Sequence, residues 1–91
     1  MNLADRGELV GFLRRYGIDA NKGLGQHFLC SQPVVSKIID ATAESVSALE
    51  VGPGPGVLSQ ALTRKFEQVT LVELDDRMET LLSESAPKAR F

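Results

Sequence analysis

The chain has 91 residues, a formal net charge of −2 and a single cysteine. It contains no apolar run of about 18 residues and no charged region followed by an apolar stretch at its N-terminus, so we expect a cytoplasmic protein without a membrane-spanning or secretory segment. The lone Cys30 cannot form an intramolecular disulfide and has no partner at metal-ligand spacing. We therefore expect no metal site, and we interpret Cys30 as a small packing residue rather than a nucleophile.

An amphipathic helix is predicted over residues 5 to 16, because apolar side chains recur there at helical spacing, and Gly17 is its expected stop. Arg14 and Arg15 fall in its last turn. Two interpretations of them stay open: a favourable interaction with the helix dipole, or a weak and salt-sensitive attraction to RNA phosphates.

A second helix is predicted after Ser31, which is a good N-cap residue, with Pro33 in the first turn. Its apolar positions predict a buried face that packs on a sheet, made of Val34, Val35, Ile38, Ile39 and Thr42.

The most informative segment follows, where an apolar run over residues 46 to 51 leads into three alternating glycines: Gly52, Gly54 and Gly56. A helical stripe comes next, and then a second apolar run over 69 to 72 that ends on Glu73. This order predicts a βαβ unit. Such a unit places Glu73 at the carboxyl end of the second strand, beside the glycine turn, where it can accept hydrogen bonds from two ribose hydroxyls. Asp75 or Asp76 is then expected to cap a further helix that ends near Ala86.

The glycine spacing bears on which nucleoside cofactor would bind. The dinucleotide fingerprint G-x-G-x-x-G would need glycine at Val57, and Pro53 and Pro55 lack the N–H groups that a pyrophosphate requires. S-adenosyl-L-methionine, which has no phosphate, fits this loop better than NAD. The N–H groups of Gly56 and Val57 are candidate donors to its carboxylate. The alternative is a glycine-rich connecting turn without a ligand.

Three segments, at residues 22 to 29, 50 to 59 and 72 to 75, resemble the rRNA adenine N6-dimethyltransferase family (KsgA/RsmA type). The same motifs occur in the same order in the related Erm resistance methylases, and the resemblance covers about residues 9 to 82. It implies an α/β fold, the N-terminal part of a Rossmann-like S-adenosylmethionine-dependent methyltransferase domain with an N-terminal helical extension. By resemblance, the cofactor-binding residues are Gln26, His27, Leu29, Glu50, Gly52, Gly54, Gly56 and Glu73.

The resemblance also implies an activity, the dimethylation of adjacent adenosines of small-subunit rRNA during ribosome biogenesis. In the family, an acidic residue after the third strand contacts the adenine, and an Asn-Leu-Pro-Tyr type motif after the fourth strand holds the target amine. This sequence contains neither. We therefore expect a fragment that carries the cofactor half of the site, with catalytic residues beyond Phe91 and no activity alone.

The expected organisation is a helical extension over residues 1–45 and the first two βα units over 46–91. The expected partner is the small-subunit rRNA or pre-ribosomal small subunit, and open sheet edges should favour self-association. Two alternatives remain: a non-enzymatic RNA-binding relative of the same fold, and a fragment of an NAD- or FAD-binding oxidoreductase.

Overall fold

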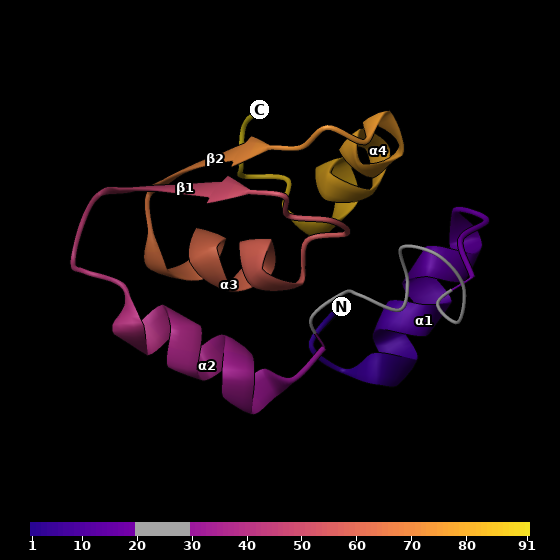
Figure 1. The fold of residues 1–91 in the computed structure, drawn as a ribbon, viewed down its shortest axis with the longest axis horizontal. Helices are drawn as coiled ribbons and strands as arrows, with labels where there is room; N and C mark the ends of the chain where they lie inside the picture. Colours follow the sequence, from indigo (N-terminus) through magenta and orange to yellow (C-terminus); the bar gives the residue numbers. More distant parts are fainter. Residues whose placement is uncertain (20–29) are drawn as a thin grey trace.

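The computed structural model describes residues 1–19 and 30–91, which form an α/β arrangement (Figure 1). The elements in chain order are α1 (Arg6–Arg15), α2 (Gln32–Ala41), β1 (Ser47–Val51), α3 (Val57–Lys65), β2 (Gln68–Val72) and α4 (Asp76–Ser85). The predicted cofactor contacts Gln26, His27 and Leu29 lie outside the described residues.

The ends of α1 confirm the predicted helix and its stop. The Asp5 side chain caps the first turn, because its carboxylate accepts a hydrogen bond from the N–H of Glu8. At the other end Gly17 has φ 75°, and the Ile18 N–H donates to the Leu13 carbonyl at 3.0 Å. This arrangement is a Schellman motif, which satisfies the last carbonyls of the helix and needs a residue that tolerates positive φ.

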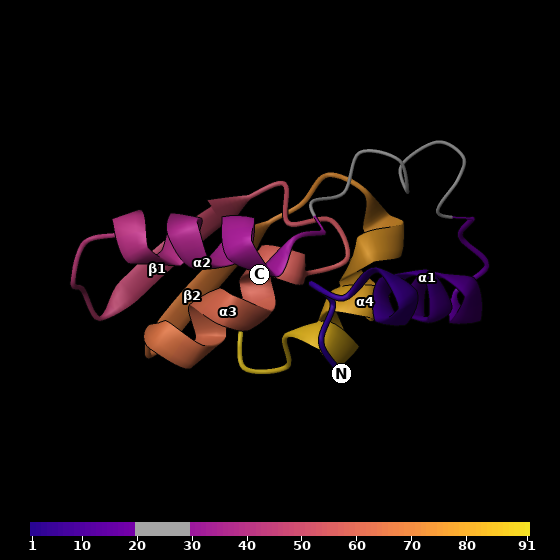
Figure 2. The same ribbon diagram turned by 90° about the horizontal axis from the view of Figure 1, so that it is seen from below.

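The predicted βαβ unit is confirmed. The two strands are parallel neighbours, and the register places Glu50 beside Leu71 and Val51 beside Val72. Alternate residues of β2 face inward, so that Val69 and Leu71 are buried. The intervening helix α3 lies beneath β2, and α2 packs against α3 farther from the sheet (Figures 1 and 2).

The far edge of β2 is also paired at one point. The Arg90 N–H donates to the Val69 carbonyl at 2.9 Å, and the Leu71 N–H donates to the Arg90 carbonyl at 2.7 Å. Thr70 and Arg90 thus form a parallel bridge. This bridge adds a third parallel segment, one residue pair long, beside β2. Only two strands were predicted from the sequence.

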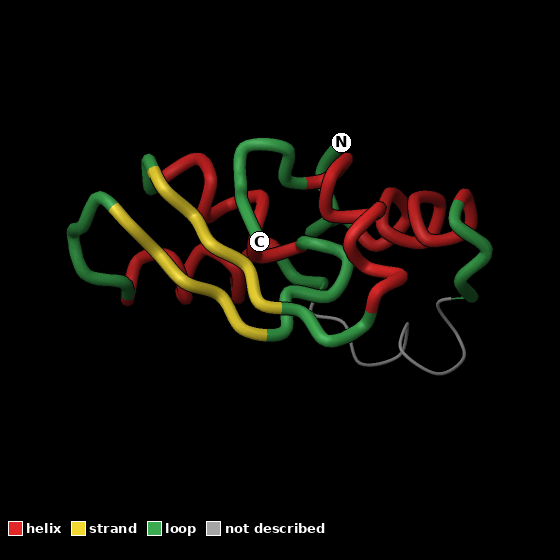
Figure 3. The backbone as a smooth tube through the Cα atoms, turned by 90° about the horizontal axis from the view of Figure 1, so that it is seen from above, coloured by secondary structure: helices red, strands yellow, loops and turns green. Residues whose placement is uncertain are grey.

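Within residues 1–19 and 30–91, nothing packs over one face of the sheet. Figure 3 shows both strands from above with no helix of the described residues over them. The side chains on this face include Leu49, Val51 and Val72, which are 65%, 75% and 45% exposed. The prediction that α2 buries its whole apolar stripe on the sheet was wrong, because α2 rests on α3 and leaves Val34 and Ile38 exposed.

A single hydrophobic cluster joins the N-terminal helix to the βα units, and it includes Leu9, Phe12, Leu62, Leu71 and Leu82. Polar contacts reinforce this junction, because Arg15 pairs with Glu84 and the Tyr16 hydroxyl donates to Glu84 at 2.6 Å. The structure thus gives Arg15 a partner on α4. Across the ranges 1–19 and 30–91, no helix is both long and apolar enough to cross a membrane.

Candidate functional site

The turn between β1 and α3 is built on three glycines with positive φ. The φ angles are 71° at Gly52, 57° at Gly54 and 104° at Gly56. Residues with a Cβ rarely adopt these angles, so the turn depends on glycine at each position. The Gly52 N–H donates to the Val72 carbonyl at 2.8 Å, which ties the start of the turn to the end of β2.

Glu73 reaches this turn from the end of β2. Its Oε1 accepts a hydrogen bond from the Gly54 N–H at 2.9 Å, and its Oε2 accepts one from the Asp75 N–H at 3.0 Å. The structure therefore brings Glu73 to the glycine turn, where the βαβ order predicts it. Each carboxylate oxygen keeps a further lone pair, so the half-buried group can accept additional hydrogen bonds from a ligand.

Glu50 approaches the same region from the inner face of the sheet. Strand alternation turns its side chain toward α3, where the Ser59 hydroxyl donates to its Oε1 at 2.5 Å. Burial raises the pKa of Glu50; the hydrogen bond from Ser59 opposes this shift, and the negative charge of Glu73 adds to it. Two carboxylates therefore flank the turn and make its surroundings electronegative.

Gly56 is constrained by α4. A Cβ added at this position would collide with the Ser85 Oγ, and it would lie 3.2 Å from the Leu82 Cδ2. The Gly56 N–H, predicted as a donor to a ligand carboxylate, already donates to the Pro53 carbonyl at 3.2 Å. By contrast, a Cβ at Gly52 would meet no atom within 4 Å. Of these two glycines, Gly52 is therefore the one beside which a ligand has room.

Two serines contribute to the site that sequence reasoning did not identify. Ser59 holds Glu50, and the buried Ser85 donates its hydroxyl to the Pro55 carbonyl at 2.7 Å. For Ser59 the sequence did contain a signal: the alternation of β1 turns Glu50 inward, and a buried acid needs a polar partner. Nothing in the sequence distinguished Ser85 from Ser83, the other serine of α4.

A pocket of about 330 Å³ lies next to Glu73, between the end of β2 and α4. It is lined by Leu71, Val72, Glu73, Asp75, Asp76, Glu79 and Phe91. None of the described residues that line it is basic, although Arg77 pairs with Asp75 at 2.7 Å from outside the pocket. A pocket with carboxylates and apolar side chains favours a neutral or cationic ligand over one that carries phosphates.

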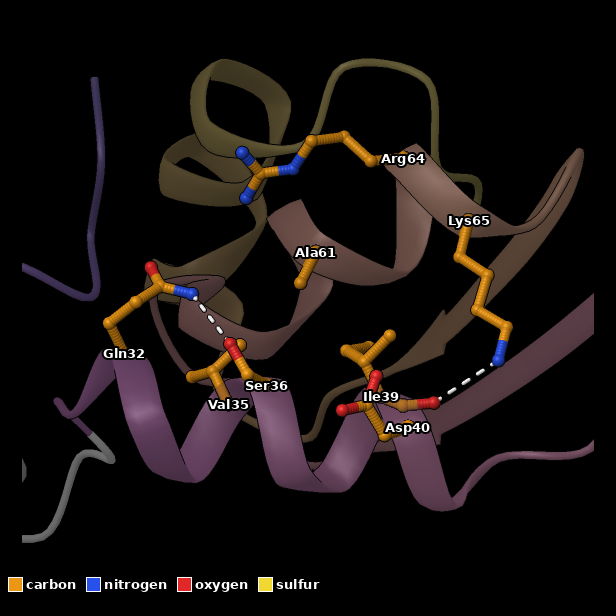
Figure 4. A pocket seen from close by; sticks show the side chains of 8 residues that line it. All are labelled: Gln32, Val35, Ser36, Ile39, Asp40, Ala61, Arg64 and Lys65. Carbon is orange, nitrogen blue, oxygen red and sulfur yellow. Dashed lines mark hydrogen bonds between the residues drawn. The ribbon is translucent and has the colours of Figure 1, made fainter.

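A groove of about 310 Å³ separates α2 from α3, and Figure 4 shows the side chains that line it. None of the predicted site residues is among them. The Lys65 ammonium donates to the Ile39 carbonyl at 3.1 Å and to the carbonyl and hydroxyl of Thr42 at 3.3 and 2.9 Å. Lys65 thereby satisfies the end of α2, so its donors are used in holding the two helices together.

Cys30 packs against the N-terminal segment, with its thiol 3.5 Å from the Ala4 carbonyl. Burial raises the pKa of the Cys30 thiol, while the charge of Arg6 opposes the shift. The thiolate is thus disfavoured, which supports the packing interpretation over the nucleophile. Among the residues that the structure describes, no group of three or more His, Cys, Asp or Glu is arranged to hold a metal ion.

The family model described as "Ribosomal RNA adenine dimethylase" matches residues 17–90. The chain belongs to the ribosomal RNA adenine dimethylase family. Membership of this family confirms the resemblance carried by the three sequence segments, and the match includes the glycine turn and Glu73.

Curated relatives of this dimethylase family carry the name "Ribosomal RNA small subunit methyltransferase A". A protein from Dehalococcoides mccartyi is 49% identical over 71 residues, which cover 76% of this chain and 24% of the relative. One from Geobacillus thermodenitrificans is 36% identical, with 92% and 29% covered. One from Streptococcus agalactiae is 36% identical, with 100% and 31% covered. The chain thus spans 24% to 31% of the length of these relatives.

Proposed function

We propose that this chain is the cofactor-binding portion of a methyltransferase that dimethylates the N6 amine of adjacent adenosines in small-subunit rRNA. The observation that carries the proposal is the carboxylate of Glu73 at the glycine turn, 2.9 Å from the Gly54 nitrogen, in a member of the dimethylase family. In this proposal the observed βαβ unit belongs to a larger Rossmann-like domain, and S-adenosyl-L-methionine is the methyl donor.

The residues around the turn fit such a cofactor. Glu73 has acceptor positions left for ribose hydroxyls, and the space beside Gly52 is open to a ligand. The carboxylates of the adjoining pocket attract a sulfonium cation and repel a pyrophosphate. This electrostatic difference favours S-adenosylmethionine over NAD or FAD, in agreement with the two prolines of the loop.

Each predicted site residue takes a part in the proposal. Glu73 orients the ribose, Gly52 and Gly54 allow close approach of the cofactor, and Gly56 shapes the turn. Glu50 contributes negative charge from the inner face of the sheet, beneath the glycine turn. By family resemblance, Gln26, His27 and Leu29 add contacts near the sulfonium.

When bound, S-adenosylmethionine supplies an electrophilic methyl group. The residues of this chain hold and orient the donor and help to exclude water, so their contribution is to place it for in-line attack by an adenine amine. The groups that hold the adenine are proposed to lie in sequence beyond Phe91. The partner is accordingly the small-subunit rRNA or its precursor particle, and the proposed location is the cytoplasm.

We also propose that the isolated chain associates with itself. Among the residues that the structure describes, β1 has no strand partner on its outer edge, and the apolar sheet face exposes Leu49 and Val51, which another copy could cover.

The proposal can be tested in a protein of the relatives' length that carries this sequence. Transfer of labelled methyl groups to small-subunit RNA should occur, and Glu73→Ala should raise the KM for S-adenosylmethionine by roughly tenfold or more, since two charge-assisted hydrogen bonds are lost. Glu73→Gln should do less damage because it keeps an acceptor. Unchanged kinetics in Glu73→Ala would refute the assignment of Glu73.

A further inference from the structure

We infer that Ser85 is a positioning residue that fixes the glycine turn against Glu73 and thereby sets the affinity of the site for its nucleoside cofactor. This inference rests on the proposed function and deepens it, because it concerns a side chain outside the loop and outside the two acidic residues. Ser85 would act through the backbone of the turn rather than by touching the ligand.

The contact between Ser85 and the turn is buried and specific. Ser85 is 6% exposed, and its hydroxyl donates to the Pro55 carbonyl at 2.7 Å. Gly56, the next residue, has no side chain with which to cap α3. Since Pro55 also lacks an N–H, this carbonyl is its backbone hydrogen-bonding group. The hydroxyl of Ser85 therefore anchors the turn at Pro55, which is fully buried.

Helix α4 contacts the site at both of its ends. At the N-cap, the Asp75 N–H donates to one oxygen of Glu73, and the other oxygen accepts from the Gly54 N–H. At the last residue of the helix, Ser85 holds Pro55. The helix, the acid and the turn thus form a closed set of contacts. Loss of the Ser85 hydrogen bond would release the turn at Pro55. The hydrogen bond from Gly54 to Glu73, at the neighbouring residue of the turn, would then loosen as well.

The close fit at Gly56 explains why a small hydroxyl residue suits this position. The Ser85 Oγ occupies the space that a Cβ at Gly56 would need, so a larger side chain at either position would push the turn away from α4. Alanine at position 85 would relieve no strain. It would leave the buried Pro55 carbonyl without its donor.

The first test uses hydrogen exchange of backbone amides in the 91-residue chain, with Ser85→Ala and the control Ser83→Ala. Ser83 is an exposed serine of the same helix whose hydroxyl donates to the Glu79 carbonyl at 2.9 Å. Ser85→Ala should speed exchange at Gly54 and Gly56 by roughly five- to tenfold, the effect of one lost hydrogen bond, and leave Leu71 unchanged. Unchanged exchange at the two glycines, or an equal rise at Leu71, would overturn the inference.

The second test measures methyl transfer in a protein of the relatives' length. Ser85→Ala should raise the KM for S-adenosylmethionine by roughly five- to tenfold and leave kcat at saturating cofactor unchanged, whereas Ser83→Ala should change neither. A lower kcat with unchanged KM would indicate a merely structural residue and would overturn the inference. If Glu73→Ala raises KM while Ser85→Ala does not, the inference fails alone. If neither variant matters, the proposed function fails.

Discussion

Replacing Gly56 with alanine should be far more damaging to folding than its small size suggests. The residue has φ 104°, a conformation that costs a residue with a Cβ about 1–2 kcal/mol. The added Cβ would also collide with the Ser85 Oγ and crowd the Leu82 Cδ2, and overpacking of this kind costs about 1–3 kcal/mol.

The two contributions together predict a loss of about 2–5 kcal/mol in the free energy of unfolding. A chain of 91 residues has a total stability of roughly 5–14 kcal/mol, so Gly56→Ala should remove a large part of it. Urea unfolding followed by circular dichroism would measure the loss.

Gly52→Ala is the matched control. Gly52 also has positive φ, 71°, but a Cβ there meets no atom within 4 Å. It should therefore cost only the conformational part, about 1–2 kcal/mol. If Gly56→Ala is no more destabilising than Gly52→Ala, the proposed packing of α4 against the turn is wrong.

Two further predictions concern the groups around the helices. Lys65→Met removes three hydrogen bonds from the end of α2 and should lower the free energy of unfolding by about 1–2 kcal/mol. The control Arg64→Met, at an exposed neighbouring residue, should change it by less than about 0.5 kcal/mol. Urea unfolding of both variants would check this. Because the folded-state pKa of Glu50 is raised above 4.5, its contribution to stability should be present at low pH and be lost as the pH rises through that pKa. Glu50→Gln should remove this component from the pH dependence of unfolding, and an unaltered dependence would contradict the burial of the carboxylate.

Local signals explain how much of the fold could be predicted. The N-cap at Asp75, the stop at Gly17 and the two strands each depend on a few neighbouring residues, and the structure has them where the sequence indicated. The approach of Glu73 to the turn was also predictable, because adjacent parallel strands end at the same edge of a sheet.

Longer-range packing accounts for the rest. Helix α3 decides whether the apolar stripe of α2 meets the sheet or another helix. The residue pattern of α2 alone could not show that Val34 and Ile38 stay exposed. The bond from Ser85 to Pro55 likewise depends on how α4 docks, 30 residues farther along the chain. Side chains that act across such separations leave no periodic signal in one sequence.

The most direct measurement is a titration of the isotope-labelled chain with S-adenosylmethionine and, separately, with NAD, followed by the backbone amide resonances. Binding to the isolated chain should be weak, so the titration should extend to millimolar ligand. S-adenosylmethionine should shift the resonances of Gly52 and Gly54, Glu73→Ala should abolish these shifts, and NAD should leave them unmoved. Equal shifts with NAD, or shifts with S-adenosylmethionine that persist in Glu73→Ala, would contradict the assignment of the glycine turn and Glu73 as the methyl-donor site.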